Sequence, residues 1–274
     1  MARTEAHAAY GFLTYYLIYI IWMGTFLMPR YLTFLACFFG IFPDLDAVYW
    51  VIKKRDKGFE GKQSIDTEFQ HHLYFWTHWP ISYSPLILIF IISLIFNFYP
   101  EYFLVPVISI YCGHLIPDSI SCGDGLMWGK IPWKKDRYAR YINLWSNKTD
   151  GYHGIWWEAR YRQTIWFKIG SIAVIASIII ILMLYINEIL QVLPGLAISG
   201  YYILPLLFLS GALIIGFKKI PEDNLKEPPE GRYADYRVNL KYINGLREKN
   251  RKKHIEKYSE LFKEKGIIEK INLK

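Results

Sequence analysis

Residues 171–186 read SIAVIASIIIILMLYI, and together with the residues from Ile165 onward they form the clearest apolar run in the chain. A helix that crosses the hydrocarbon core of a bilayer needs ~20 mostly apolar residues. Working outward from this run, six stretches reach or approach that length: residues 10–28, 32–52, 81–98, 103–120, 165–186 and 196–217. The sequence therefore predicts an all-α, polytopic membrane protein with about six transmembrane helices.

Composition divides the chain into an apolar part and a polar tail. Hydrophobic residues make up 53% of the whole, against about 45–50% in soluble proteins. Residues 1–217 are predicted to form the transmembrane domain. Residues 218–274 hold 16 Lys and Arg against 10 Asp and Glu, and are predicted to be a basic, helical tail. Such a tail beside a bilayer favours anionic lipid headgroups as partners, and it contains no motif typical of nucleic-acid recognition.

The positions of Lys and Arg predict the orientation in the membrane. The connection 53–80 holds five, the connection 121–164 holds eight, and the tail holds sixteen. The connections on the opposite side, 29–31, 97–102 and 187–195, hold one, none and none. Since basic connections stay in the cytoplasm, we expect a multi-pass protein of the plasma (inner) membrane with both termini cytoplasmic.

Histidines and aspartates occur in four separate segments near predicted span ends. One histidine precedes the first span, two aspartates follow Pro43, three histidines precede the third span, and a His-x-x-x-Asp pair closes the fourth. They are His7; Asp44 and Asp46; His71, His72 and His78; His114 and Asp118. The predicted orientation brings all four segments to the cytoplasmic side of the membrane. Ionisable residues at membrane depth are functional by default.

Imidazole and carboxylate ligands together suit Zn, Mn or Fe, and we expect zinc first, with one to three ions. His7, Asp44, His78, His114 and Asp118 are the predicted metal ligands. Asp46 and His72 are predicted to be further ligands or to act on water as base and orienter. Simpler roles stay open, because His7 can be an interfacial residue and Asp46 a helix cap. His71 and His72 are neighbours, so we expect only one of them to be a ligand.

The order of these residues resembles a family of bacterial and archaeal inner-membrane proteins described as metal-dependent hydrolases, one of them as LexA-binding. The pattern is an early His, then Pro-Asp-x-Asp, then His followed by Thr-His, then His-x-x-x-Asp. It is more distantly similar to zinc-dependent phospholipase C and its related single-strand nucleases. The resemblance covers roughly residues 1–133. The positions it implies as functional are His7, Asp44, Asp46, His72, Thr77, His78, His114 and Asp118.

Residues and resemblance together predict a membrane-bound, metal-dependent hydrolase that cleaves a phosphoester of a lipid or lipid-linked substrate. The first alternative is a non-enzymatic transporter or scaffold with a structural metal site. A transport path calls for ionisable groups on both sides of the membrane, whereas the predicted outer half has few. The second alternative is a metal-dependent nuclease, for which salt-dependent nucleic-acid binding would be the sign.

Overall fold

The computed structural model describes residues 3–53, 72, 75–121, 126–129, 141–142, 161–192, 200–219 and 248–267. Within these ranges the regular secondary structure is helical, except for two paired antiparallel strands of two residues each, β1 (Leu126–Met127) and β2 (Tyr141–Ile142). The predicted all-α fold class is therefore confirmed. The Lys- and Arg-rich connections fall mostly outside the described residues, as does His71.

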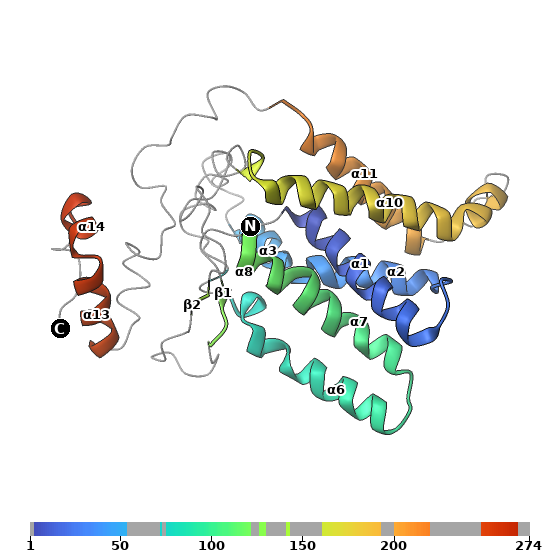
Figure 1. The fold of residues 1–274 in the computed structure, drawn as a ribbon, viewed down its shortest axis with the longest axis horizontal. Coiled ribbons are helices and arrows are strands. Elements are labelled where there is room, and N and C mark those ends of the chain that lie inside the picture. The colour runs from blue at the N-terminus through green and yellow to red at the C-terminus, as the bar shows by residue number, and fades with distance from the viewer. Residues whose placement is uncertain are drawn as a thin grey trace.

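The helix α1 (Thr4–Met23) lies at the centre of the bundle and packs against α2 (Arg30–Ile41), α7 (Pro100–Ile110) and α10 (Ile165–Val192). Figure 1 shows these helices running side by side along the long axis of the molecule. The α1 helix ends at Gly24, which takes the left-handed conformation (φ +66°) that glycine adopts at little cost. The N-terminal half of α1 lies against the C-terminal end of α2 and the turn that follows α7, since Gly40 approaches the backbone of His7 and Gly113 that of Gly11.

Two further apolar helices complete the bundle. The α11 helix (Gly200–Gly216) packs against α2 and α10, and α6 (Ser84–Ile95) packs against α7. Many of the side chains that face outward are large and apolar, among them Ile21, Met183 and Ile214, each more than 70% exposed. Exposed apolar surface on this scale is typical of a membrane-contacting protein.

Three helices among the described residues are long and apolar enough to cross a membrane: Arg30–Tyr49, Pro100–Ser121 and Ile165–Ile189. They coincide with the second, fourth and fifth predicted spans. The helices Pro80–Ile95 and Gly200–Gly216 are apolar but shorter. The first predicted span, 10–28, corresponds to α1, which begins earlier in the chain because its polar first turns are also helical. Six spans remain a prediction.

Two of the long helices change their winding next to a proline. After α2, residues Phe42–Asp44 form the 3₁₀ turn η1, and α3 (Leu45–Lys53) follows it. After α7, residues Tyr111–Leu115 form a π-helical turn, η5, and α8 (Ile116–Ser121) follows. Isolated π turns inside α-helices are frequent at functional sites. The altered turns carry Asp44 and His114.

Close backbone contacts hold α1, α2 and η5 together at this end of the bundle. A Cβ atom on Gly11 would lie 2.7 Å from the carbonyl oxygen of Ala36. A Cβ atom on Gly40 would collide with the backbone of His7, and one on Gly113 with the backbone of Gly11. Only glycine permits this approach, as in other tightly packed membrane helices. The backbone carbonyls of Gly40 and Gly113 thereby come within reach of side chains on neighbouring helices.

Four shorter elements complete the described structure. Two 3₁₀ turns, η3 (Trp76–His78) and η4 (Pro80–Tyr83), precede α6. In the region predicted as a basic helical tail, the described residues form α13 (Glu248–Lys257) and α14 (Ser259–Glu264). The binding of this tail to lipid stays a prediction.

Candidate metal centre

His7 and His114 stack on each other in the buried interior, and a backbone carbonyl orients each ring. Their ring centroids are 3.9 Å apart. The Nδ1 atom of His7 is 3.2 Å from the carbonyl oxygen of Gly113, and that of His114 is 2.8 Å from the carbonyl oxygen of Gly40. A carbonyl oxygen only accepts hydrogen bonds, so each Nδ1 carries the proton. Each Nε2 atom therefore carries a lone pair; that of His114 lies 3.2 Å from Nε2 of His78, and that of His7 has no hydrogen-bond partner among the described residues.

The local sequence explains why these two carbonyls are available. In an α-helix the carbonyl of Gly113 would accept a hydrogen bond from the residue four positions later, which is Pro117. Proline has no N–H to donate, so this carbonyl is open to the ring of His7. Gly40 lies in the last turn of α2, where carbonyls lack partners within the α-helix. Both helix irregularities thus help to orient the histidines.

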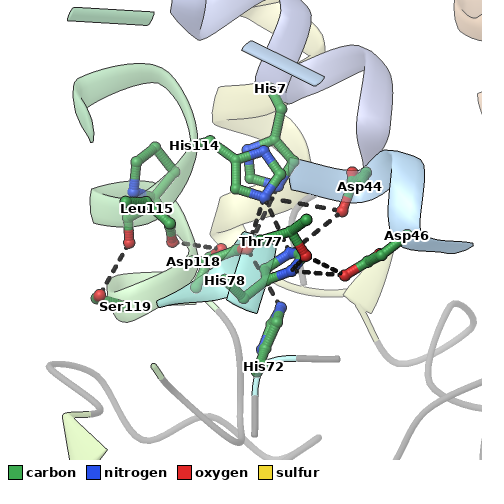
Figure 2. Close-up of polar contacts among 12 residues, drawn as sticks. His7, Asp44, Asp46, His72, Thr77, His78, His114, Leu115, Asp118 and Ser119 are labelled. Carbon is green, nitrogen blue, oxygen red and sulfur yellow. Dashed lines mark hydrogen bonds and ion pairs between the residues drawn. The ribbon is translucent and has the colours of Figure 1, made fainter. Parts of the chain in front are cut away.

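Asp44 and Asp46 contact different nitrogens of the His78 ring, and Figure 2 shows both aspartates beside it. The Nδ1 atom of His78 is 3.0 Å from Oδ2 of Asp46, whereas its Nε2 atom is 3.6 Å from Oδ1 of Asp44. The hydroxyl of Thr77 donates to the same Asp46 oxygen at 2.6 Å. Asp46 therefore accepts two hydrogen bonds, and the Nε2 atom of His78 is directed toward Asp44.

The pKa of the His78 ring reflects the negative charge of the carboxylates around it. Burial lowers the pKa of its ring, but the neighbouring carboxylates of Asp46 and Asp44 raise it to about 8. The net change shows that the carboxylates outweigh the cost of burying a charge. The cluster therefore favours positive charge at this position.

Asp118 contacts three of the four clustered histidines. Its Oδ1 atom is 3.1 Å from Nε2 of His7, and its Oδ2 atom is 3.2 Å from Nε2 of His72 and 3.3 Å from Nε2 of His114. The His114 contact follows from the four-residue spacing, which puts both side chains on one helical face. His7 and His72 come from other segments. Asp118 is thus the residue on which these separate segments converge.

Several polar atoms of the cluster are buried without hydrogen bonds. Among the described residues, neither carboxylate oxygen of Asp44 or Asp118 has a hydrogen-bond partner, nor does Nε2 of His7. Buried polar groups in proteins are nearly always hydrogen-bonded, because leaving one unsatisfied costs about 1–3 kcal/mol. These atoms face the common centre in Figure 2. A bound cation would satisfy them, and the residues present fit that role.

Three groups of ligand atoms lie within 4.8 Å of one another, each with residues that are all buried. The first is His7, His114 and Asp118; the second is Asp44, His78 and His114; the third is His72, His78 and Asp118. One imidazole Nε2 has one lone pair and binds one ion. The first and third groups have no histidine in common and share only Asp118, whose two oxygens permit it to bridge two ions.

The structure brings together six of the seven residues singled out for the site. They are His7, Asp44, His72, His78, His114 and Asp118. The seventh, Asp46, contacts Nδ1 of His78, and its predicted role as a further ligand or as a base or orienter of water stays a prediction. His71 lies outside the described residues.

Among the described residues, three groups that contribute to the site were not predicted from the sequence. The carbonyls of Gly40 and Gly113 orient two histidines, and the hydroxyl of Tyr83 donates to the carbonyl oxygen of Thr77 at 2.6 Å. Small residues within apolar spans often mark close helix contacts, so the glycines carried a usable signal. Tyr83 carried none, because its partner is a backbone atom in a neighbouring turn.

Comparisons of this chain with protein-family models, with curated proteins and with solved structures gave no match. The family resemblance inferred from the motifs therefore remains a prediction.

Proposed function

We propose that this protein is a membrane-bound, metal-dependent hydrolase that cleaves a phosphoester of a lipid or lipid-linked substrate at the cytoplasmic face. One observation supports the proposal above all others. Separate segments of the chain bring four imidazoles and two carboxylates into one buried cluster, in which both carboxylates lack hydrogen bonds among the described residues. Burying ionisable groups in a membrane protein costs free energy, so a cluster of them is most readily explained by a function.

We propose two divalent ions, with Asp118 as the bridging ligand. His7 and His114 would bind the first ion, and His72 and His78 the second. Asp44, 3.6 and 3.7 Å from Nε2 of His78 and His114, is near both positions and would complete the ligand set. Zinc is the first candidate, and manganese and iron suit the same ligands.

The protein residues around the cluster have distinct tasks in this proposal. Asp46 holds the His78 ring in the orientation that aims Nε2 inward. Asp44 in the cluster and Asp46 beside it are each 6% exposed, whereas the histidines and Asp118 are completely buried, so water and substrate would reach the cluster from the side of these two aspartates. Divalent ions bound there would lower the pKa of water and polarise a phosphoryl oxygen.

We further propose the six-span topology, with both termini in the cytoplasm and the basic tail on anionic headgroups. The distribution of Lys and Arg supports this orientation. It would put the cluster on the cytoplasmic side, because His7 is near the start of the first span and Asp118 near the end of the fourth.

Metal content and hydrolysis test the proposal together. The protein purified in detergent should contain close to two divalent ions per chain by inductively coupled plasma mass spectrometry. It should also hydrolyse a phospholipid or a polyprenyl phosphate. His114→Ala and Asp118→Ala should lose both properties, whereas His254→Ala, a histidine in α13 outside the cluster, should keep them. Wild-type metal content in the first two variants would show that the site is wrong.

A further inference from the structure

The α3 helix carries an exposed apolar stripe that begins between the two aspartates of the cluster. Leu45, Val48, Tyr49 and Ile52 are 39%, 54%, 55% and 61% exposed. Their spacing of three, four and seven residues puts them on one side of a helix. Asp46, one position after Leu45, is buried and contacts His78. The helix therefore directs one side to the cluster and another away from the protein.

Among the described residues in and beside the cluster, the two aspartates next to this stripe are slightly less buried than the histidines and Asp118. His7, His72, His78, His114 and Asp118 are completely buried, and Asp44 and Asp46 are each 6% exposed. Leu45 stands between these two aspartates in the chain. On the side of η3, Trp76 is also exposed and directly precedes Thr77. The side of the cluster that lies nearest the surface is therefore bordered by apolar side chains.

The stripe continues the apolar surface of a membrane helix. The candidate span Arg30–Tyr49 includes Leu45, Val48 and Tyr49. Each exposed apolar side chain gains about 25 cal/mol per Å² when it leaves water, so this surface favours hydrocarbon over cytosol. A water-soluble substrate gains nothing from it.

From this geometry we infer that the stripe Leu45, Val48, Tyr49 and Ile52 binds the hydrocarbon chain of the substrate. The substrate class is a membrane lipid with a phosphoester group, which reaches the cluster from the bilayer along α3. The lipid's apolar chain contacts the stripe while its phosphoester meets the edge formed by Asp44 and Asp46. This inference rests on the proposed hydrolase function and adds a route and a specificity surface to it.

A paired comparison of two apolar surfaces tests the inference. Val48→Ser with Ile52→Ser alters the stripe. Leu204→Ser with Leu207→Ser makes equivalent changes on α11, where the side chains are similarly exposed, 56% and 65%. Each protein is assayed in nanodiscs of dioleoylphosphatidylcholine doped with dioleoylphosphatidylglycerol, and separately with soluble bis(4-nitrophenyl) phosphate.

We expect the α3 pair to lower kcat/KM for the lipid by about 10-fold or more, the range that apolar contacts confer on specificity. Its hydrolysis of the soluble ester and its metal content should stay at the wild-type level, and the α11 pair should change neither activity. An equal loss on both substrates would overturn the inference, as would the same loss in the α11 pair.

A second measurement decides the inference if the wild type hydrolyses neither substrate, in which case the proposed function itself fails. Benzoylphenylalanine at position 48 or 204 is photolysed in the same nanodiscs, and the lipid adducts are identified by mass spectrometry. Adducts at position 48 enriched in phosphatidylglycerol, relative to position 204, support a lipid site on α3. Adducts that match the bulk lipid at both positions overturn it.

Discussion

Buried polar groups occur at both ends of the helix bundle, and they are satisfied in different ways. At the end near the start of α2, the hydroxyl of Tyr185 donates to the carbonyl oxygen of Met28 at 2.9 Å and lies 2.6 Å from the Thr33 hydroxyl. The hydroxyl of Tyr15 donates to the carbonyl oxygen of Glu101 at 2.8 Å. At the other end, Asp118 has both oxygens buried without a hydrogen bond among the described residues.

This difference distinguishes polar groups that stabilise the fold from polar groups that form a site. The hydroxyls are neutral groups, and their hydrogen bonds to carbonyls complete the helix packing. The carboxylates and imidazoles are ionisable, and they point at one another rather than at backbone donors. Burying a charged group without compensation costs far more than burying a hydroxyl. We therefore interpret the first end as a stabilising layer and the second as a site for cations.

The largest effect should come from Asp118→Asn, which keeps the shape of the side chain but removes the charge that three histidines share. Zinc affinity should fall by more than about 100-fold, because loss of an outer partner alone costs about 10–100-fold. Competition titration of the purified protein against a zinc chelator measures this. Wild-type affinity in this variant would remove Asp118 from the proposed ligand set.

A smaller loss is expected for Asp46→Ala. The carboxylate contacts the Nδ1 side of His78, so its removal should free the ring without deleting a ligand. Zinc affinity should fall by about 10–100-fold, as for other outer partners of metal-binding histidines, and the metal count at saturating zinc should not change. If the metal count itself falls, Asp46 is a ligand rather than an orienting residue.

The convergence of the cluster could be predicted from sequence by way of a predicted topology. His7 and Asp118 are far apart in the chain, but the alternating Lys and Arg counts predict that both lie on one side of the membrane. The four-residue spacing of His114 and Asp118 likewise predicts one helical face, and the structure has them 3.3 Å apart. The shared side of the membrane follows from the rule that basic connections stay in the cytoplasm, and the shared helical face follows from helix geometry.

The ring orientations could not be predicted in the same way. Which nitrogen of His7 or His114 faces inward depends on the carbonyls of Gly113 and Gly40. Their positions depend on how three helices pack and on the turns beside Pro43 and Pro117. The roles of Asp44 and Asp46 depend on the winding of a single 3₁₀ turn. Periodicity in a sequence does not specify such contacts.

At the opposite end of the bundle, Tyr185→Phe should affect stability and leave metal binding unchanged. The Thr33 hydroxyl and the carbonyl of Met28 would lose their shared partner in a buried position. The free energy of unfolding should fall by about 1–3 kcal/mol, as measured by titration with sodium dodecyl sulfate in mixed micelles. A change in zinc affinity would show that the two ends are not independent.

The smallest effect should come from Tyr83→Phe, which removes a hydroxyl that reaches Asp46 only through two successive hydrogen bonds, by way of Thr77. Tyr83 donates to the backbone of Thr77, and Thr77 in turn donates to the carboxylate that orients His78. A single hydrogen bond contributes about 1 kcal/mol, so zinc affinity should fall about 5-fold. Tyr111→Phe is the matched control, since that hydroxyl donates at the same 2.6 Å distance to the carbonyl of Pro80, outside this chain of contacts. Equal losses in both variants would mean that the hydroxyls only stabilise the turns η3 and η4, whereas a loss confined to Tyr83→Phe extends the orienting network to that residue.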